Sequence, residues 1–306
     1  MTESTRDLFL QQLNDVLVHE RHRAASEGVA DATLDALVCR GLIRDRIGGF
    51  FSNSYTPGTP DVCGICRGPS GEALCAKCAA ARNVFGDQLA DRTVLLTYAV
   101  GNHPAGRHQS AHHMLTYKGY RGQPPAVECA EDLALMISIV VDMHRSCLQS
   151  WLGSPWDSLT FVPSRERPDA THPVANLANA ALPRFTRASA MQKFLLTPGD
   201  GTYDRHELVA DRYTVDERWR SRVHGKHVLI VDDTWTTGAS AQGAAIAVKT
   251  AGAASATIPC VARWLKWEWG EHKSLIESLT GGFDVLRCPV HGRPCDAATR
   301  FRISMD

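Results

Sequence analysis

Short apolar runs alternate with longer amphipathic segments through the middle of the chain. The runs with strand character are residues 92–100, 158–163, 227–233 and 255–263. Apolar residues at helical spacing occur between them, in segments 128–152, 172–182 and 239–253. Short apolar strands that alternate with helices favour parallel pairing. We therefore expect an α/β fold with a doubly wound parallel sheet over residues 86–263.

The flanking segments have a different pattern. Residues 1–60 carry apolar positions at helical spacing and end in the turn-forming stretch GGFFSNSYTPGTPD, which predicts a helical N-terminal extension. Residues 61–85 are rich in cysteine and form a small module of their own. Residues 264–306 begin with a tryptophan-rich segment, which predicts an amphipathic helix starting near Trp264, and continue into a loop that could bind metal.

The amino-acid composition disfavours two functional classes, dedicated nucleic-acid binders and membrane proteins. The 306 residues contain 33 basic and 33 acidic side chains, so the formal net charge is zero. This balance does not indicate a dedicated nucleic-acid binder. No apolar run approaches the roughly 20 residues that cross a bilayer, and no N-terminal export signal is visible. We expect a cytoplasmic protein that does not bind membranes.

Four cysteines in the segment CGICRGPSGEALCAKC have metal-ligand spacing. They are Cys63, Cys66, Cys75 and Cys78, two C-x2-C pairs separated by eight residues. Each pair can present two thiolates to one ion, and the glycine- and proline-containing turn between them can bring the pairs together. The pattern predicts a structural Zn2+ site with no open position. The alternatives are two redox pairs or unrelated thiols.

The stretch VLIVDDTWTTGAS joins a buried strand to a helix through an acidic pair and a loop of small residues. Such a loop exposes backbone N–H groups at the positive end of the helix dipole, which favours a phosphate. Gly238 permits close approach, and hydroxyl groups on either side add donors. Asp232 and Asp233 suit a ribose diol next to that phosphate, or could hold Mg2+ directly. The predicted phosphate-binding residues are Thr236, Thr237, Gly238, Ala239 and Ser240.

The sequence HVLIVDDTWTTGAS resembles the PRPP-binding signature of type I phosphoribosyltransferases, which use 5-phosphoribosyl 1-pyrophosphate (PRPP) with Mg2+. With CGIC…CAKC and LTYKGY, the chain resembles the ComF-like branch over roughly residues 61–263. The resemblance implies that Asp232 and Asp233 are the catalytic pair and hold the ribose hydroxyls, while the loop after them wraps the 5′-phosphate. It also implies a pyrophosphate loop at Pro163, Ser164 and Arg165, and it aligns Lys118 with a lysine common in the family.

Some positions depart from the family pattern. Residues 169–173 replace the Arg-Gly-Phe-Asn-Gln run usual in ComF-like proteins. Thr236 stands where related 6-oxopurine enzymes carry an aspartate base, and a threonine cannot take that proton at neutral pH. The segment 184–222 corresponds to a mobile lid, in which Arg184, Arg187 and Lys193 are candidates to neutralise pyrophosphate. The acceptor is therefore unidentified, and we disfavour hypoxanthine and guanine.

The C-terminal segment CPVHGRPC contains three further soft ligands. Cys288, His291 and Cys295 have C-x2-H-x3-C spacing and predict a candidate second metal site. The fourth ligand would come from elsewhere, for example Cys260 or His272. The alternative is a cysteine-containing loop without metal.

Two functions are compatible with these features. The first is a Mg2+-dependent phosphoribosyltransferase, a transferase of the glycosyltransferase class, that moves phosphoribosyl from PRPP to an unidentified acceptor and releases pyrophosphate. The second is a non-catalytic protein that senses PRPP or a nucleotide, or a scaffold in a DNA-uptake or DNA-processing assembly. ComF-like proteins are associated with natural DNA uptake, so the partner in that case would be a protein or single-stranded DNA.

Overall fold

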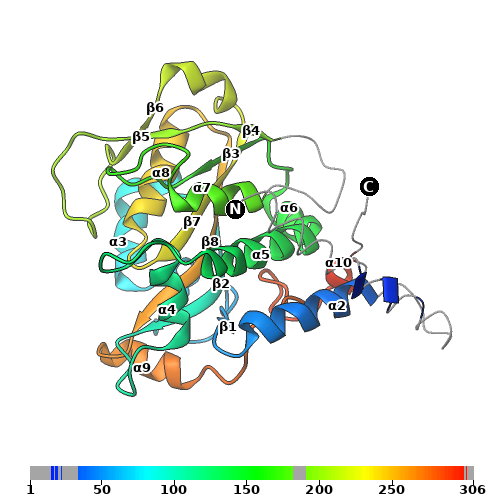
Figure 1. The fold of residues 1–306 in the computed structure, drawn as a ribbon. Helices are drawn as coiled ribbons and strands as arrows, with labels where there is room; N and C mark the ends of the chain where they lie inside the picture. The colour runs from blue at the N-terminus through cyan, green and yellow to red at the C-terminus, as the bar shows by residue number, and fades with distance from the viewer. Residues whose placement is uncertain are drawn as a thin grey trace.

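A computed structural model describes residues 34–181, 191–299 and 301, together with five single positions between residues 15 and 22. Its centre is a six-stranded sheet in the order β1-β2-β8-β7-β3-β4 (Figure 1). The strands are β1 (Ser52–Asn53), β2 (Arg92–Gly101), β3 (Ser158–Phe161), β4 (Gln192–Lys193), β7 (His227–Trp235) and β8 (Ser255–Lys266). Only β1 pairs antiparallel among the described strands of this sheet, which confirms the expected α/β fold with a mostly parallel sheet.

Helices lie on both faces of the sheet. The α-helices are α2 (Leu34–Ile43), α3 (Ala76–Phe85), α4 (Gln109–Thr116), α5 (Val127–Met143), α6 (Arg145–Leu152), α7 (Pro173–Ala180), α8 (Ala239–Thr250), α9 (Gly270–Glu277) and α10 (Asp296–Thr299). Short π- or 3-10 turns follow at Arg44–Gly48, Gly86–Gln88 and Glu217–Arg222. Within the described ranges, no helix has both the length and the apolar character that crossing a bilayer requires.

Alternation along β7 divides the core into two clusters. Leu229 and Val231 pack with α5 and α7 on one face, whereas Val228 and Ile230 pack with α8 on the other. Successive residues of a strand point to opposite faces of the sheet. Because helices cover both faces, the sequence of the strand is a continuous apolar run, Val228–Val231. This layering places the carboxyl end of β7, with its two aspartates, at the edge of a sheet whose central strands are buried.

The segment before the cysteine module belongs to the same core. Ile43, Ile47 and Phe51 are almost fully buried in the cluster that contains α5, and β1 pairs with β2 through Ser52 and Tyr98. Most of residues 1–33, where the rest of the helical extension was expected, lie outside the described residues. The predicted division into four segments, 1–60, 61–85, 86–263 and 264–306, remains a prediction.

Two predicted helices have different bounds in the structure. The segment 128–152 is two helices, α5 and α6, that break at His144, whose imidazole is fully buried and bonded to the Val285 carbonyl oxygen at 2.7 Å. The helix expected from Trp264 begins at Gly270 instead. Residues 264–266 continue β8 because they pair with 99–101 of β2, and this pairing outweighs the helical periodicity.

The segment expected to form a lid contains a second, two-stranded antiparallel sheet. Its strands are β5 (Leu196–Pro198) and β6 (Tyr213–Val215). Leu196 and Tyr213 are buried in the cluster beside α8. Arg184 and Arg187 lie outside the described residues, and Lys193 donates to the Asn179 side-chain oxygen at 2.8 Å. The described part of this segment therefore packs on the domain through β5 and β6.

We predict that Leu229→Ala lowers the free energy of unfolding by about 2–5 kcal/mol, because it removes a fully buried side chain from the cluster between the sheet and α7. Urea denaturation followed by circular dichroism in zinc-containing buffer measures the change. Val127→Ala is the control, since Val127 is 63% exposed and its replacement should change stability by less than about 0.5 kcal/mol. Equal effects of the two substitutions would contradict the assigned core.

Candidate functional site

Two adjacent carboxylates are buried at the carboxyl end of β7. Asp232 and Asp233 are 6% and 3% exposed. The ammonium group of Lys118, just after α4, lies 2.7 Å from Asp233 Oδ2, and the Thr234 hydroxyl donates to the same oxygen at 2.8 Å. The amide of Asp233 donates to Asp232 Oδ1 at 2.9 Å. The structure thus brings together the predicted acidic pair and the lysine of the LTYKGY segment.

The two carboxylates have opposite pKa shifts. Burial, and then the charge of Asp233, raises the pKa of Asp232 well above its ordinary value. Burial also opposes ionisation of Asp233, but the nearby Lys118 ammonium and the Thr234 hydroxyl outweigh it, so the pKa of Asp233 is lowered. One carboxylate is therefore stabilised as an anion while the charge of the other is poorly compensated. Hydroxyl donors or a cation bound here would relieve that cost.

Sequence reasoning missed two ring side chains, His172 and Tyr213, whose pKa values the charges of this pair affect. His172, at the start of α7, accepts from the Val174 amide through Nδ1 at 3.2 Å and stacks on Phe161. Burial, and then the Lys118 cation, lowers the pKa of His172 to about 4, so the imidazole is neutral near pH 7. A histidine directly before a proline at a predicted helix start is an N-cap signal that could have located it.

Tyr213, from β6, is the second such group. It is 6% exposed, and its hydroxyl donates to the Pro163 carbonyl oxygen at 3.1 Å. Burial raises the pKa of Tyr213 to about 12, and the negative charge of Asp232 also acts on it. No local pattern in the sequence marks this residue, because it reaches the site only through the second sheet.

The loop between β7 and α8 has the geometry of a phosphate cradle. Gly238 has φ +83°, and a Cβ there would lie 2.4 Å from the indole ring of Trp235, so only glycine fits. The Ala239 amide, at the start of the 12-residue helix α8, donates to the Thr237 hydroxyl oxygen at 3.4 Å, and the N-cap residue Gly238 provides no side-chain cap. Thr236–Ser240 therefore wrap the positive end of a long buried helix.

One buried arginine supports this loop from below. Arg263 is 5% exposed, and its Nη1 donates to the carbonyl oxygens of Trp235 (3.0 Å), Thr236 (2.5 Å) and Trp264 (2.9 Å). A Cβ on Gly68 of the cysteine module would lie 2.8 Å from Nη2 of the same guanidinium. Arg263 therefore fills the space between the phosphate loop and the cysteine module and contacts both.

The predicted pyrophosphate loop starts at the same edge of the sheet. Pro163 follows β3, which pairs in parallel with β7, so both strands run towards the same edge of the sheet. The exposed Arg165 guanidinium stacks on the Tyr203 ring at 4.6 Å and donates to the Gly201 carbonyl oxygen. Ser164 accepts from the Arg167 amide at 3.2 Å. Arg165 thus contacts the segment before β6, and its role toward pyrophosphate remains a proposal.

The four cysteines of the module converge. The sulfur atoms of Cys63, Cys66, Cys75 and Cys78 all lie within 4.8 Å of one another, with Cys66 and Cys75 3.7 Å apart. Two thiolates bound tetrahedrally to one zinc at 2.3 Å lie roughly 3.8 Å apart. The residues therefore fit a structural Zn2+ ion. The module is attached to the sheet by Arg67, which donates to the Thr93 carbonyl oxygen at 2.9 Å.

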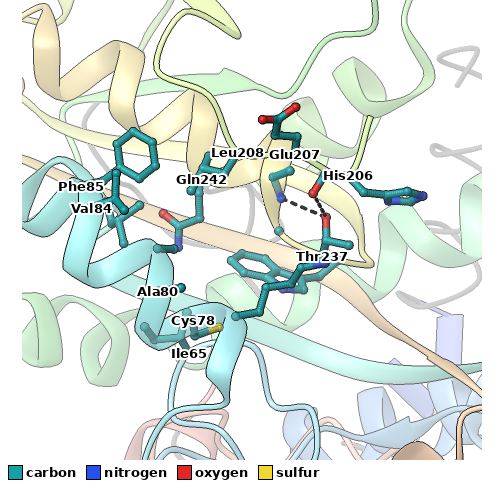
Figure 2. Close-up of a pocket in the computed structure, with 16 residues that line it drawn as sticks. Ile65, Cys78, Ala80, Val84, Phe85, His206, Glu207, Leu208, Thr237 and Gln242 are labelled. Carbon is teal, nitrogen blue, oxygen red and sulfur yellow. Dashed lines mark hydrogen bonds between the residues drawn. The ribbon is translucent and has the colours of Figure 1, made fainter. Parts of the chain in front are cut away.

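A cavity of about 320 Å3 lies between the module and the phosphate loop (Figure 2). Side chains of α3, including Val84 and Phe85, line one side, and Thr237 with the segment His206–Leu208 lines another. The Thr237 hydroxyl lies 3.4 Å from the His206 carbonyl oxygen. Neither Asp232 nor Asp233 lines this cavity, so it is separate from the acidic pair.

Comparisons with known proteins give distant structural likenesses. No protein-family model and no curated protein matches the chain. One similar solved structure is described as the allosteric regulatory enzyme of purine biosynthesis, with 15% identity and TM-score 0.27 over 42% of this chain and 26% of that chain. Another is described as an asparagine mutant from an analysis of an invariant aspartic acid in HPRTs. It has 20% identity and TM-score 0.27, and the match covers 46% of this chain and 69% of that chain. Because both TM-scores are low, the functional proposal is based on the geometry of the site and not on these likenesses.

We predict that Asp232→Asn stabilises the folded protein by about 1–2 kcal/mol at pH 7, because it removes a buried charge beside Asp233 and keeps the acceptor oxygen for the Asp233 amide. The folded-state pKa of Asp232 is raised, so wild-type stability falls as pH rises above the ordinary aspartate pKa of about 4. The advantage of the variant should therefore shrink towards pH 4.

Urea midpoints measured from pH 4 to pH 8 check this dependence. The control is Asp87→Asn, because Asp87 is exposed and its replacement should leave the wild-type profile unchanged. A variant that is less stable than the wild type at pH 7, or an advantage that does not depend on pH, would contradict the assigned electrostatics.

Proposed function

We propose that this chain is a phosphoribosyltransferase-type protein that binds PRPP together with Mg2+ at the carboxyl end of β7. One observation carries the proposal: a buried acidic pair is followed directly by a glycine-centred loop at the start of a long helix, and a lysine from a separate segment contacts the second carboxylate. The arrangement offers a phosphate site and a diol site on consecutive residues. Ribose 5-phosphate carries those two groups a few bonds apart.

The loop 236–240 would hold the 5′-phosphate. Its backbone amides and the helix dipole favour an anion, and the hydroxyls of Thr236, Thr237 and Ser240 add donors. Trp235 beneath Gly238 keeps the backbone in its left-handed turn, and Arg263 binds the carbonyl oxygens on the other side of the loop. Because these supports are buried, the loop is preorganised and needs little rearrangement to bind.

The acidic pair would accept hydrogen bonds from the ribose hydroxyls. Asp232 has the less compensated charge, and two hydroxyl donors would stabilise it. Lys118 keeps Asp233 ionised and fixes its orientation. Mg2+ bound with the diphosphate would supply positive charge for the leaving group, and the pair lies where carboxylates could contact that ion.

The proposed reaction is substitution at the anomeric carbon of the ribose with release of pyrophosphate. The protein's part is to orient the ribose and to exclude water, and it forms no bond to the substrate itself. Pro163, Ser164 and Arg165 are proposed to contact the pyrophosphate because they follow β3 at the same sheet edge. Thr236 supplies no base for a 6-oxopurine, so the acceptor class is not assigned.

The second candidate is a protein that senses PRPP or a nucleotide, or a scaffold of a DNA-uptake or DNA-processing assembly with a protein or single-stranded DNA partner. Arg263 favours this candidate, since its guanidinium bonds the phosphate loop and also packs against Gly68 of the cysteine module. A ligand on the loop could thus act on the surface of the module. The two candidates share the binding site and differ in whether pyrophosphate is released.

We predict that the zinc-loaded wild type binds PRPP in the presence of Mg2+, and that Asp232→Asn/Asp233→Asn weakens this binding at least about 100-fold, or roughly 2.7 kcal/mol. The double replacement keeps the side-chain volume but removes both charges that accept the ribose hydroxyls. Isothermal titration calorimetry measures the affinity, and Asp87→Asn is the control that should bind as the wild type does.

Three outcomes are informative. Binding by the wild type but not by the double variant supports the site, and subsequent pyrophosphate release with a panel of acceptors identifies an enzyme. Binding without release from any acceptor favours the sensing function. No binding by the folded wild type, or equal binding by the double variant, overturns the assignment.

A further inference from the structure

A second group of sulfur and imidazole ligands gathers where the C-terminal loop meets α6. Cys288 lies within 4.8 Å of His144 and Cys295, which are also within that distance of each other. Cys288 also lies within 4.8 Å of Cys147 and His291, which are within that distance of each other. The sulfurs of Cys147 and Cys295 are 3.5 Å apart, well beyond the length of a disulfide bond. Three thiols therefore surround one point.

The ligands expected from elsewhere are in different places. Cys260 is opposite Asp232 in the β7–β8 pairing, and its thiol contacts the Ala262 carbonyl oxygen. His272 accepts from the Lys266 amide through Nδ1 at 3.0 Å. Neither belongs to a candidate metal-ligand group of the described residues. The partners of the C-terminal loop are instead His144 and Cys147, which the break between α5 and α6 presents together.

The C-terminal loop repeats the backbone turn of the first cysteine module. The Cys63 amide donates to the carbonyl oxygen five residues later at 2.8 Å, and the Cys288 amide does the same at 3.1 Å. In each loop the amide four residues after the cysteine donates back to the cysteine carbonyl oxygen, at 3.0 and 2.8 Å. The backbone of that residue has the left-handed conformation in both loops: Arg67 has φ 55° and Gly292 has φ 70°.

Each turn is closed by one antiparallel bridge at the same position. The bridges are Val62 with Pro69 and Arg287 with Pro294. In the first module this turn presents Cys63 to a four-sulfur cluster. The shared turn therefore indicates that the second loop presents Cys288 in the same way, for the same kind of ion.

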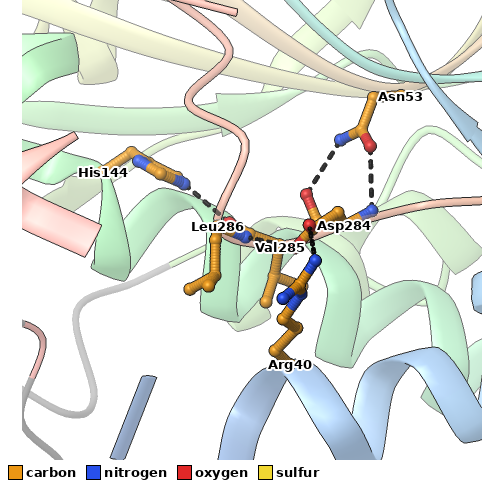
Figure 3. A network of polar contacts seen from close by, with 6 residues as sticks. All are labelled: Arg40, Asn53, His144, Asp284, Val285 and Leu286. Atoms are coloured by element: carbon orange, nitrogen blue, oxygen red, sulfur yellow. Dashed lines mark hydrogen bonds and ion pairs between the residues drawn. The ribbon is translucent and has the colours of Figure 1, made fainter. Parts of the chain in front are cut away.

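His144 is oriented for metal binding. It is fully buried, and its Nε2 lies 2.7 Å from the Val285 carbonyl oxygen (Figure 3). This nitrogen must donate, so in the neutral imidazole Nδ1 carries the lone pair. Nδ1 faces the Cys295 sulfur at 3.4 Å. The Cys295 thiol can donate to this lone pair, and a zinc ion that displaces the thiol proton would be bound by the same two atoms. A ring held by a backbone carbonyl is the usual arrangement of a zinc-bound histidine.

We propose that Cys147, Cys288, Cys295 and His144 bind a second structural Zn2+ ion. Three sulfurs and one nitrogen fill a tetrahedral site and leave no position for water. His291 occupies the place of Cys66 in the repeated turn and lies within 4.8 Å of Cys147 and Cys288. We assign the fourth position to His144 because His144 is fully buried, whereas His291 is exposed to solvent. A cavity of about 740 Å3 lined by Cys147, His291 and Cys295 lies beside the cluster and gives zinc a route to it.

The ion would fasten the C-terminal loop to the helical layer. Residues just before the loop are already held by polar contacts: Asn53 bonds the Asp284 backbone at 2.8 and 3.0 Å, and Arg40 contacts the Asp284 carboxylate at 2.6 Å (Figure 3). Val285 and Cys288 are almost fully buried. Zinc would add a bond from this segment to the start of α6, far from the phosphate loop in sequence.

Zinc content of the purified full-length chain tests the proposal. We expect two zinc ions per wild-type chain, one in Cys295→Ser, one in His144→Asn, and two in His291→Ala. Cys129→Ser is the matched control and should keep both ions, because Cys129 belongs to none of the candidate metal-ligand groups of the described residues and its sulfur accepts from the Thr116 hydroxyl. Cys66→Ser should also lose one ion, and Cys66→Ser/Cys295→Ser should lose both. Each variant is measured on its folded fraction, as judged by circular dichroism.

X-ray absorption of the wild type covers the case in which a variant does not fold. One four-sulfur site and one site with three sulfurs and a nitrogen average about 3.5 sulfur and 0.5 nitrogen ligands per zinc. A single zinc per wild-type chain, or four sulfurs around every zinc, overturns the proposal. Loss of the second ion from His291→Ala with retention in His144→Asn would reassign the histidine ligand and overturn the one proposed here.

Discussion

The ion pair between Lys118 and Asp233 makes the rest of the site feasible. Two adjacent carboxylates at the end of a buried strand would be strongly unfavourable alone, because each loses its hydration and repels the other. Lys118 compensates one of them at 2.7 Å and keeps it ionised. The negative charge of the other carboxylate, Asp232, remains unfavourable because of its burial and the neighbouring charge of Asp233. An incompletely compensated charge of this kind is common at binding sites, where the ligand supplies the missing partner.

The same sheet edge collects groups from distant parts of the chain. Asp232 and Asp233 come from β7, Lys118 follows α4, His172 begins α7 and Tyr213 lies in β6. Parallel strands end together, so every loop after such a strand meets at one edge. The rigid two-sided core beneath that edge holds these side chains in position, which is what a site built on orientation requires.

Metal sites would attach peripheral segments to this core from two directions. The first module contacts the phosphate loop through Arg263, so its fold bears on the ligand site. The second cluster lies where the C-terminal loop meets α6. Both use the same closed turn, in which a backbone carbonyl and amide fix the cysteine before any metal binds. A short turn with few apolar residues gains its stability from the bound ion.

Local sequence patterns were sufficient to predict several structural features of this protein. The strand–loop–helix around Asp232 and Gly238, the four-cysteine spacing and the mostly parallel sheet are readable because each depends on neighbours in sequence: period, turn residues and ligand spacing. The continuation of β8 through Trp264 was not readable, since pairing with β2 outweighs helical periodicity. Tertiary structure alone decided that Lys118 contacts Asp233, that Arg263 lies between the phosphate loop and the cysteine module, and that His144 and Cys147 lie close to Cys288. Those contacts join residues more than 20 positions apart, and strand pairing together with the packing of helices on the sheet brings them together.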